Sequence, residues 1–201
     1  MSVMLPWPFM HKAPSSMTDS EKQLLLQLAR ASIGSRWEPG LQDKILVIQQ
    51  QLERFAQPQA CFVTLHLDGK LRGCIGTLEA TMSLSHAICH YAKAAAFEDP
   101  RFYPLDKSEW VDIIISITLL GPLRPVPAEN RETLLSRLTA EKAGLYLKDA
   151  QHSATFLPMV WQQLPEPAQF LDALLEKGRW QAGIWPTAIR AWLYSGDEFS
   201  E

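Results

Sequence analysis

Apolar positions recur along this chain with two different periods, which predict helices in some segments and strands in others. A period of three to four residues predicts helices over residues 18–34, 41–55, 83–97, 128–138 and 168–176, with a further helix beginning at Pro158. β-rich runs bounded by turn residues predict strands over residues 61–67, 70–76, 111–120 and 188–194, and a short hairpin over 145–156. Because the strands occur mostly as hairpins and do not alternate strictly with helices, the pattern favours an α+β fold with helices packed on an antiparallel sheet.

Length and composition limit this fold to one domain or two small lobes. The 201 residues are 47% apolar, which is typical of a globular protein with a sizeable core. Residues 1–16 contain three prolines and no uninterrupted apolar segment, so we expect a tail or an N-terminal arm rather than a secretion signal or a membrane span. Residues 17–201 are expected to form the domain itself.

Charge and cysteine content exclude several classes of protein. The net charge is −3 and the two signs are interspersed, so the chain has no basic field and we expect neither DNA nor RNA as a partner. Three cysteines are an odd number, and without a secretion signal they indicate free thiols in a reducing cytoplasm.

The hairpin over residues 61–76 carries the candidate chemistry. Asp68-Gly69 is a strong two-residue turn signal between the two β-rich runs. A two-residue loop would place Leu65 opposite Arg72 and Val63 opposite Cys74. The alternation of side chains would then put Arg72 and Cys74 on one face of the return strand, roughly 7 Å apart.

Two glycines flank the thiol on this strand. Glycine weakens a strand, so Gly73 and Gly76 indicate that another element approaches the backbone closely. Cys74 is either a nucleophile whose thiolate Arg72 favours or a small buried hydrophobic residue. In the register above His66 points to the opposite face, which leaves Cys74 without a base, so we predict the packing role.

Three sequence blocks resemble the AMMECR domain family. They are Leu-Arg-Gly-Cys-Ile-Gly-Thr at residues 71–77, Ala-Ala-Ala-Phe-Glu-Asp-Pro-Arg-Phe at 94–102 and Ala-Thr-Phe-Leu-Pro-Met-Val-Trp at 154–161. Their order and spacing agree with the family over roughly residues 20–195, as does the segment around residues 170–178. The chain is most similar to the bacterial branch, known as AmmeMemoRadiSam system protein A.

The resemblance implies a fold and a set of partners, but no reaction and no cofactor. It implies an α+β protein with a large lobe and a small lobe around a cleft, with the signature strand in the cleft region and the small lobe as an insertion. The family name implies two partners: a "mediator of cell motility" protein, itself similar to extradiol dioxygenases, and a radical-S-adenosylmethionine protein.

Five more candidate residues, besides the glycines and the thiol, lie in the matched blocks or directly after them. An arginine on a core-facing strand needs a counter-charge, so Arg72 either pairs with Asp99 or Glu79 or contacts an anionic ligand. Arg101 poses the same choice, because it either binds an anion or fixes its turn onto the sheet. Thr155 precedes the helix expected at Pro158, where its hydroxyl could help bind an anion or, as we favour, belong to a helix cap beside an apolar clamp.

A metal site is not predicted. His86 and His90 have the i, i+4 spacing that can hold a metal, with Cys89 between them, but no third ligand at a suitable distance is evident. A solvated helix face explains the two histidines better.

Two classes of function follow from these residues and the resemblance. The first is an enzyme or an anion-binding protein that uses the cleft near Arg72 and Cys74, in a modification role with the implied partners. The second is a non-catalytic adaptor that docks those partners, for which five tryptophans offer aromatic anchors: Trp110, Trp161, Trp180, Trp185 and Trp192.

Overall fold

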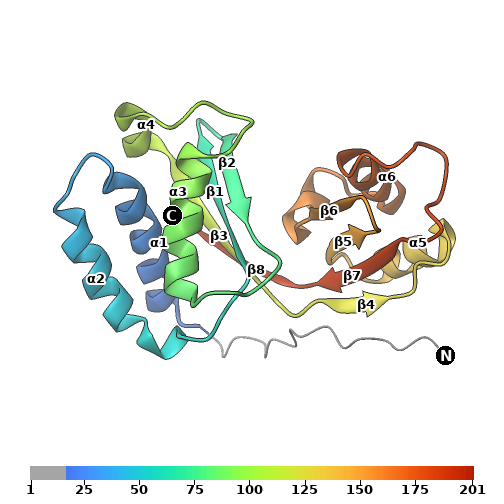
Figure 1. Ribbon diagram of the computed structural model, residues 1–201, viewed down its shortest axis with the longest axis horizontal. Helices are drawn as coiled ribbons and strands as arrows, with labels where there is room; N and C mark the ends of the chain where they lie inside the picture. The colour runs from blue at the N-terminus through green and yellow to red at the C-terminus, as the bar shows by residue number, and fades with distance from the viewer. Residues whose placement is uncertain (1–16) are drawn as a thin grey trace. The chain divides into compact units, whose positions relative to one another are not determined.

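The computed structural model describes residues 17–201, so the predicted tail or arm at residues 1–16 lies outside the described residues. The described residues form two compact units (Figure 1). The first unit extends to Leu120 and also includes Asp197–Glu201. The second unit, Gly121–Gly196, is therefore inserted into the first.

The first unit combines helices with a four-stranded sheet of order β2-β1-β3-β8. A capping box formed by Thr18 and Glu21 begins the first helix, as the sequence predicts. The elements are α1 (Asp19–Gly34), α2 (Leu41–Gln51), β1 (Cys61–Leu67), β2 (Lys70–Gly76), α3 (Leu84–Phe97), α4 (Lys107–Asp112), β3 (Ile114–Leu120) and β8 (Gly196–Ser200).

One face of this sheet packs against the helices and contributes its side chains to the core. Every second residue of β1 and β3 points toward the helices, because side chains alternate along a strand. Helix α3 packs on β1 and β2, and α1 packs on α3 and β3. The side chains of this face are almost completely buried: Cys61, Val63, Leu65, Ile115, Ile117 and Leu119.

The β1–β2 hairpin has the predicted turn but not the predicted register. Asp68 and Gly69 both adopt positive φ, 50° and 73°, which a tight hairpin turn of this kind requires. The register then shifts between Leu65 and His66, so that Leu65 lies opposite Gly73 and Arg72 is the extra residue of a β-bulge. The expectation that Leu65 lies opposite Arg72 and Val63 opposite Cys74 is therefore wrong, because it assumed an uninterrupted ladder.

The second unit has its own sheet, of order β4-β7-β5-β6, and its own core. Helices α5 and α6 contribute to that core, in which the rings of Trp161 and Phe170 stack with centroids 3.9 Å apart. The elements are β4 (Arg124–Val126), α5 (Arg131–Ala140), β5 (Gly144–Lys148), β6 (Ser153–Phe156), a 3₁₀ turn (Pro158–Gln162), α6 (Pro167–Lys177) and β7 (Arg190–Tyr194).

The predicted fold class is confirmed, since helices pack on two antiparallel sheets. Three short elements, α4, β4 and β8, were not predicted. The strand predicted from residue 111 begins at Ile114 because residues 107–112 form α4. The strand predicted as the last is followed by β8, whose mixed polar sequence suits the edge of a sheet.

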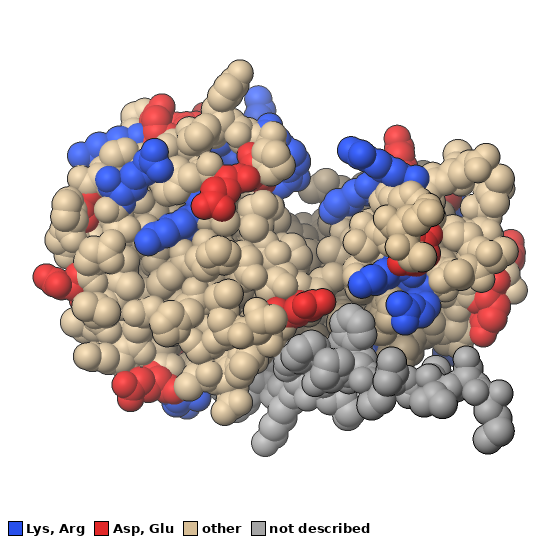
Figure 2. All heavy atoms as spheres, viewed as in Figure 1, with Lys and Arg blue, Asp and Glu red and all other residues tan. Residues whose placement is uncertain are grey.

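Surface charge and helix length are two further features of the fold. On the face shown in Figure 2, acidic and basic side chains are mixed over both units. Among the residues from 17 onward, no helix is both long and apolar enough to cross a membrane.

Candidate functional site

Cys74 lies on the face of the first sheet that points away from the helices. In the observed register Cys74 is opposite Thr64, and Thr64 is opposite Ser116. Thr64 alternates along β1 with Val63 and Leu65, which face the core. Cys74, Thr64 and Ser116 therefore form a polar row across three neighbouring strands.

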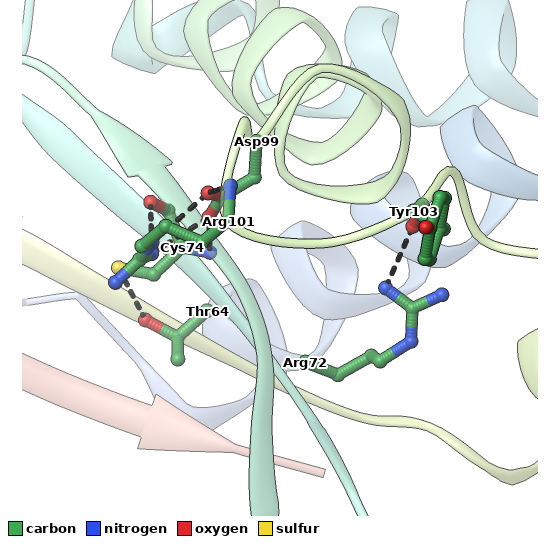
Figure 3. A network of polar contacts seen from close by, with 6 residues as sticks. All are labelled: Thr64, Arg72, Cys74, Asp99, Arg101 and Tyr103. Carbon is green, nitrogen blue, oxygen red and sulfur yellow. Dashed lines mark hydrogen bonds and ion pairs between the residues drawn. The ribbon is translucent and has the colours of Figure 1, made fainter.

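Asp99 fixes the backbone at the thiol. This buried carboxylate accepts a hydrogen bond from the N–H of Cys74 at 2.9 Å, and bonds from Nε and Nη2 of Arg101 at 2.9 and 2.6 Å (Figure 3). The Arg101 side chain, helped by the N–H groups of Cys74 and Arg101, lowers the pKa of Asp99 from 3.8 to about 2, although burial opposes the shift. Asp99 is thus ionised at neutral pH and holds both β2 and Arg101 in place.

Arg101 presents a guanidinium beside the thiol. Its Nη2 donates to the carbonyl of Cys74 at 3.3 Å, and the hydrogen bond with Asp99 raises the Arg101 pKa. About half of the side chain is exposed, 53%. Within the described residues no hydrogen bond uses Nη1, so this nitrogen of the guanidinium can donate to an anion other than Asp99.

The Cys74 thiol is partly exposed and accepts a hydrogen bond. Thr64 Oγ1 donates to Cys74 Sγ at 3.3 Å. By contrast, Cys61 faces the core, where burial raises its pKa to about 12. Burial also raises the pKa of Cys89. The packing role predicted a buried Cys74, and the structure instead exposes part of this side chain.

His66 lies on the same face of β1 as Thr64, two residues away. The prediction that His66 points to the opposite face from Cys74 is wrong, because the bulge shifts the pairing of β2 by one residue. Within the described residues no hydrogen bond joins His66 to the thiol.

Of the two roles that the sequence leaves open for Arg72, the structure has the ion pair, with a partner that was not predicted. Arg72 forms a two-pronged ion pair with Glu109, with Nε–Oε1 and Nη2–Oε2 distances of 2.7 and 2.8 Å. Its Nη1 donates to the carbonyl of Tyr103 at 3.0 Å. Figure 3 shows Arg72 directed toward Tyr103 and away from Cys74, so it does not activate the thiol.

The carboxylate partner predicted for Arg72 is therefore wrong, since Asp99 pairs with Arg101 and Glu109 pairs with Arg72. The ion pair with Arg72 lowers the pKa of Glu109. Glu109 also closes a capping box with Asp106 at the beginning of α4. The spacing Asp106-x-x-Glu109 was the sequence signal that could have identified both this helix and its acid.

Both glycines of the motif lie where a side chain would collide with backbone. A Cβ on Gly73 would overlap the carbonyl oxygen of Ala95 in α3. A Cβ on Gly76 would overlap the carbonyl oxygen of Cys61 and the ring of Phe62. The two glycines therefore allow the backbone of β2 to lie directly against α3 and β1.

The remaining candidates lie outside this network. Glu79 is exposed after β2, where only its backbone hydrogen-bonds to the hydroxyl of Thr77. Thr155, in the second unit, donates to the carbonyl of Leu145 at 2.9 Å and also hydrogen-bonds Tyr194. The favoured helix-cap role of Thr155 is wrong, since the 3₁₀ turn at Pro158 has Leu157 as its N-cap and no side-chain cap hydrogen bond.

The helix with the two histidines contains no metal site in the described residues. His86 Nδ1 hydrogen-bonds the Ser83 hydroxyl at 2.7 Å, and His90 packs against Tyr91. Nowhere in residues 17–201 do three or more histidine, cysteine or acidic side chains gather in a group that could hold a metal ion.

Comparison with known proteins identifies the family. A sequence profile of the AMMECR1 family matches residues 26–199 of this chain. The chain therefore belongs to the AMMECR1 family, which confirms the resemblance of the three motif blocks.

Relatives of this chain include proteins of archaea and bacteria. Protein MJ0810 of Methanocaldococcus jannaschii is 32% identical over 146 residues, which cover 72% of this chain and 71% of that protein. A protein of Aquifex aeolicus is 28% identical over 181 residues, covering 88% and 91%. The crystal structure of the uncharacterized protein PH0010 from Pyrococcus horikoshii shares the fold, with a TM-score of 0.78, 21% identity, and coverage of 92% and 93% of the two chains.

Proposed function

We propose that this protein binds a small anionic molecule beside Cys74, with the guanidinium of Arg101 as the cationic contact. The observation that carries the proposal is the geometry of Arg101: Asp99 holds it, half of the side chain is exposed, and no hydrogen bond within residues 17–201 uses its Nη1. Such a pre-oriented guanidinium loses little freedom when it binds a carboxylate or phosphate.

Arg72 supports the stability of the site rather than its ligand contact. All three of its guanidinium nitrogens are engaged by Glu109 and Tyr103. An anion contact was one of two alternatives for both Arg72 and Arg101, and our proposal assigns it to Arg101 alone. Cys74 lines the same site, and its Thr64 hydrogen bond and the nearby guanidinium both favour the thiolate.

Two alkylating reagents of similar size but different charge test this proposal. Iodoacetate is an anion and iodoacetamide is neutral, so the ratio of their rates at Cys74, relative to the same ratio for glutathione, reports local attraction for anions. We expect a relative ratio of about 5 or more at Cys74, because a guanidinium lies beside the thiol. Peptide mass spectrometry of the full chain reads the labelling at each cysteine.

Substitutions assign the effect to Arg101. Arg101→Met should reduce the relative ratio to that of glutathione, and Arg101→Lys should restore part of it. Arg124 is a matched control, because it is also ion-paired and 54% exposed, so Arg124→Met should leave the ratio unchanged. A ratio equal to that of glutathione in the unmodified protein would refute the proposed anion site.

An adaptor role is the second candidate, and one exposed aromatic residue favours it. Tyr103 follows directly on the second motif block, and 90% of it is exposed, while its carbonyl is held by Arg72. A rigidly placed tyrosine is a typical anchor of a protein interface. In this role the partners would be the dioxygenase-like and radical-S-adenosylmethionine proteins that the family resemblance implies.

The adaptor role is tested separately from anion binding. Purified dioxygenase-like and radical-S-adenosylmethionine proteins from the same organism would each be mixed with the chain and analysed by size-exclusion chromatography. We expect Tyr103→Ala to weaken any complex tenfold or more while the iodoacetate preference stays intact. If neither protein co-elutes with the unmodified chain, this second candidate is wrong.

A further inference from the structure

A cavity of about 1040 Å³ lies within the second unit. Its wall consists of the beginning of α5, the outer face of α6 and the loop of residues 180–185, and it shares no residue with the site at Cys74. Parts of the wall face solvent, since the Asp172 side chain is 60% exposed and Ile184 is 57% exposed. Small-molecule sites typically have volumes of about 300–1000 Å³. The cavity is therefore large enough and open enough to admit a small molecule.

The charge of the cavity wall is negative. The wall contains one arginine, Arg131, and three acids, Glu132, Asp172 and Glu176, which leaves a net charge of −2. Arg131 Nη2 donates to Asp172 Oδ1 at 2.5 Å, so these two charges compensate each other. Among residues 17–201, no hydrogen bond or ion pair uses the carboxylate of Glu132 or Glu176. Two uncompensated carboxylates on a concave surface raise the local concentration of cations.

The two helix ends at the cavity also favour a cation. Glu176 lies in the last turn of α6, where the helix dipole disfavours an acid, so the helix alone does not explain its position. The neighbouring Lys177 donates to the carbonyl of Thr155 at 2.9 Å and does not line the cavity. At the beginning of α5, Asn130 caps the helix and Glu132 lies in the first turn, so this end is already compensated for its positive partial charge.

Two tryptophans hold the loop that completes the cavity. The indole N–H of Trp180 donates to Asp149 Oδ2 at 2.6 Å, and that of Trp185 donates to the carbonyl of Ala128 at 3.0 Å. The loop is thus fixed at both ends, so its side of the wall is formed before a ligand binds. Because both N–H groups are engaged, the rings offer a ligand their apolar surface and π faces, together with the exposed Ile184. Such rings bind organic cations well.

We infer that this cavity is a second binding site, for a small organic cation that carries an apolar or aromatic group. The acidic part of the wall, Glu132 and Glu176, attracts the ammonium group, and Trp185 and Ile184 pack against the apolar group. The inference is independent of the proposed anion site at Arg101. The two sites lie in different units and prefer ligands of opposite charge.

Three small probes separate the contributions of charge and of the aromatic group. Phenethylamine carries a ring and an ammonium group, phenylacetate carries a ring and a carboxylate, and ethylamine carries the ammonium group alone. Each probe is titrated into the isotope-labelled full chain, and the indole N–H signal of Trp185, assigned with Trp185→Phe, reports binding by nuclear magnetic resonance. We expect the Kd of phenethylamine to be at least about tenfold lower than that of either other probe.

Substitution of Glu176 assigns the preference to the cavity wall. Glu176→Gln should raise the Kd of phenethylamine about fivefold and should not weaken the binding of phenylacetate. Its melting temperature should not fall, because the variant removes an acid from the last turn of a helix. Glu166 is a matched control, since it is exposed, directly precedes α6 and does not line the cavity, so Glu166→Gln should leave both Kd values unchanged.

Three results would overturn the inference. The first is an equal Kd for phenethylamine and phenylacetate, and the second is a Trp185 signal that none of the probes shifts. The third is an equal loss of affinity in Glu166→Gln and Glu176→Gln, which would show that only the net charge of the protein matters. The iodoacetate preference at Cys74 tests the proposed function separately, so each of the two sites can fail without the other.

Discussion

The substitution Gly73→Ala tests how closely the motif strand packs on helix α3. The added Cβ would overlap the carbonyl oxygen of Ala95, which belongs to the helix backbone and cannot rotate away. Strand β2 cannot simply move outward either, because Asp99 holds Cys74 and Glu109 holds Arg72. Helix and strand must therefore separate, or the strand must break one of these contacts.

The expected cost follows from two opposing effects. Overpacking of this kind costs about 1–3 kcal/mol, and loss of glycine flexibility in the unfolded chain returns about 0.4–1 kcal/mol. We expect a net loss of about 1–2 kcal/mol in the free energy of unfolding. At about 2–4 °C per kcal/mol for a protein of this size, the melting temperature should fall by about 2–8 °C.

A second glycine provides the control. Gly40 precedes α2 with φ −60°, and nothing lies within 4 Å of an added Cβ, so Gly40→Ala should be neutral or slightly stabilising. Urea denaturation and calorimetry of both variants give the comparison. If Gly73→Ala is as stable as Gly40→Ala, the backbone contact between β2 and α3 does not restrict this position and the argument is refuted.

Three further predictions concern the charged groups and thiols. Because its pKa is lowered to about 2, the ionised Asp99 contributes about 2 kcal/mol to the free energy of unfolding. This contribution is complete above about pH 4 and is lost as the pH falls through 2, so the corresponding step should be missing when the stability of Asp99→Asn is measured as a function of pH. Glu109→Gln leaves Arg72 without its counter-charge and should lower the free energy of unfolding by about 1–3 kcal/mol, whereas an unchanged urea midpoint would contradict the ion-pair role. At pH 8 iodoacetamide should label Cys74 at least about a hundredfold faster than Cys61, whose pKa burial raises to about 12; comparable rates would show that Cys61 is not enclosed by the core.

The sequence predicted local elements well and the site less well. The hairpin ranges and the Asp68-Gly69 turn were correct because turn chemistry and β-rich runs are local signals. The bulge at Arg72 was not, since it depends on how β2 meets its neighbours. That one-residue shift removed Arg72 from the thiol and placed His66 on the same face as Cys74.

Partners distant in sequence account for the other differences. Arg72 and Glu109 are 37 residues apart, and two nearer acids in the motif blocks competed for the same assignment. Asp99 and Arg101 were identified as candidates, yet only the structure shows that their pair holds the N–H of Cys74. The burial of Ser116 and Thr118 could not be predicted from the sequence, because serine and threonine are common on the solvent-exposed face of a strand.

The insertion of the second unit affects how the first one can fold during synthesis. Strand β3 ends at Leu120 and its outer neighbour β8 begins at Gly196, so the ribosome must add residues 121–195 in between. At about 5–20 residues per second this takes roughly 4–15 s, during which one edge of the nascent sheet stays open. An open edge can pair with other chains, whereas the inserted unit already has a complete sheet of its own. We therefore expect the inserted unit to complete its folding before the other unit does. Chaperones that cover exposed strands should then improve the yield of the unit that contains β3 and β8.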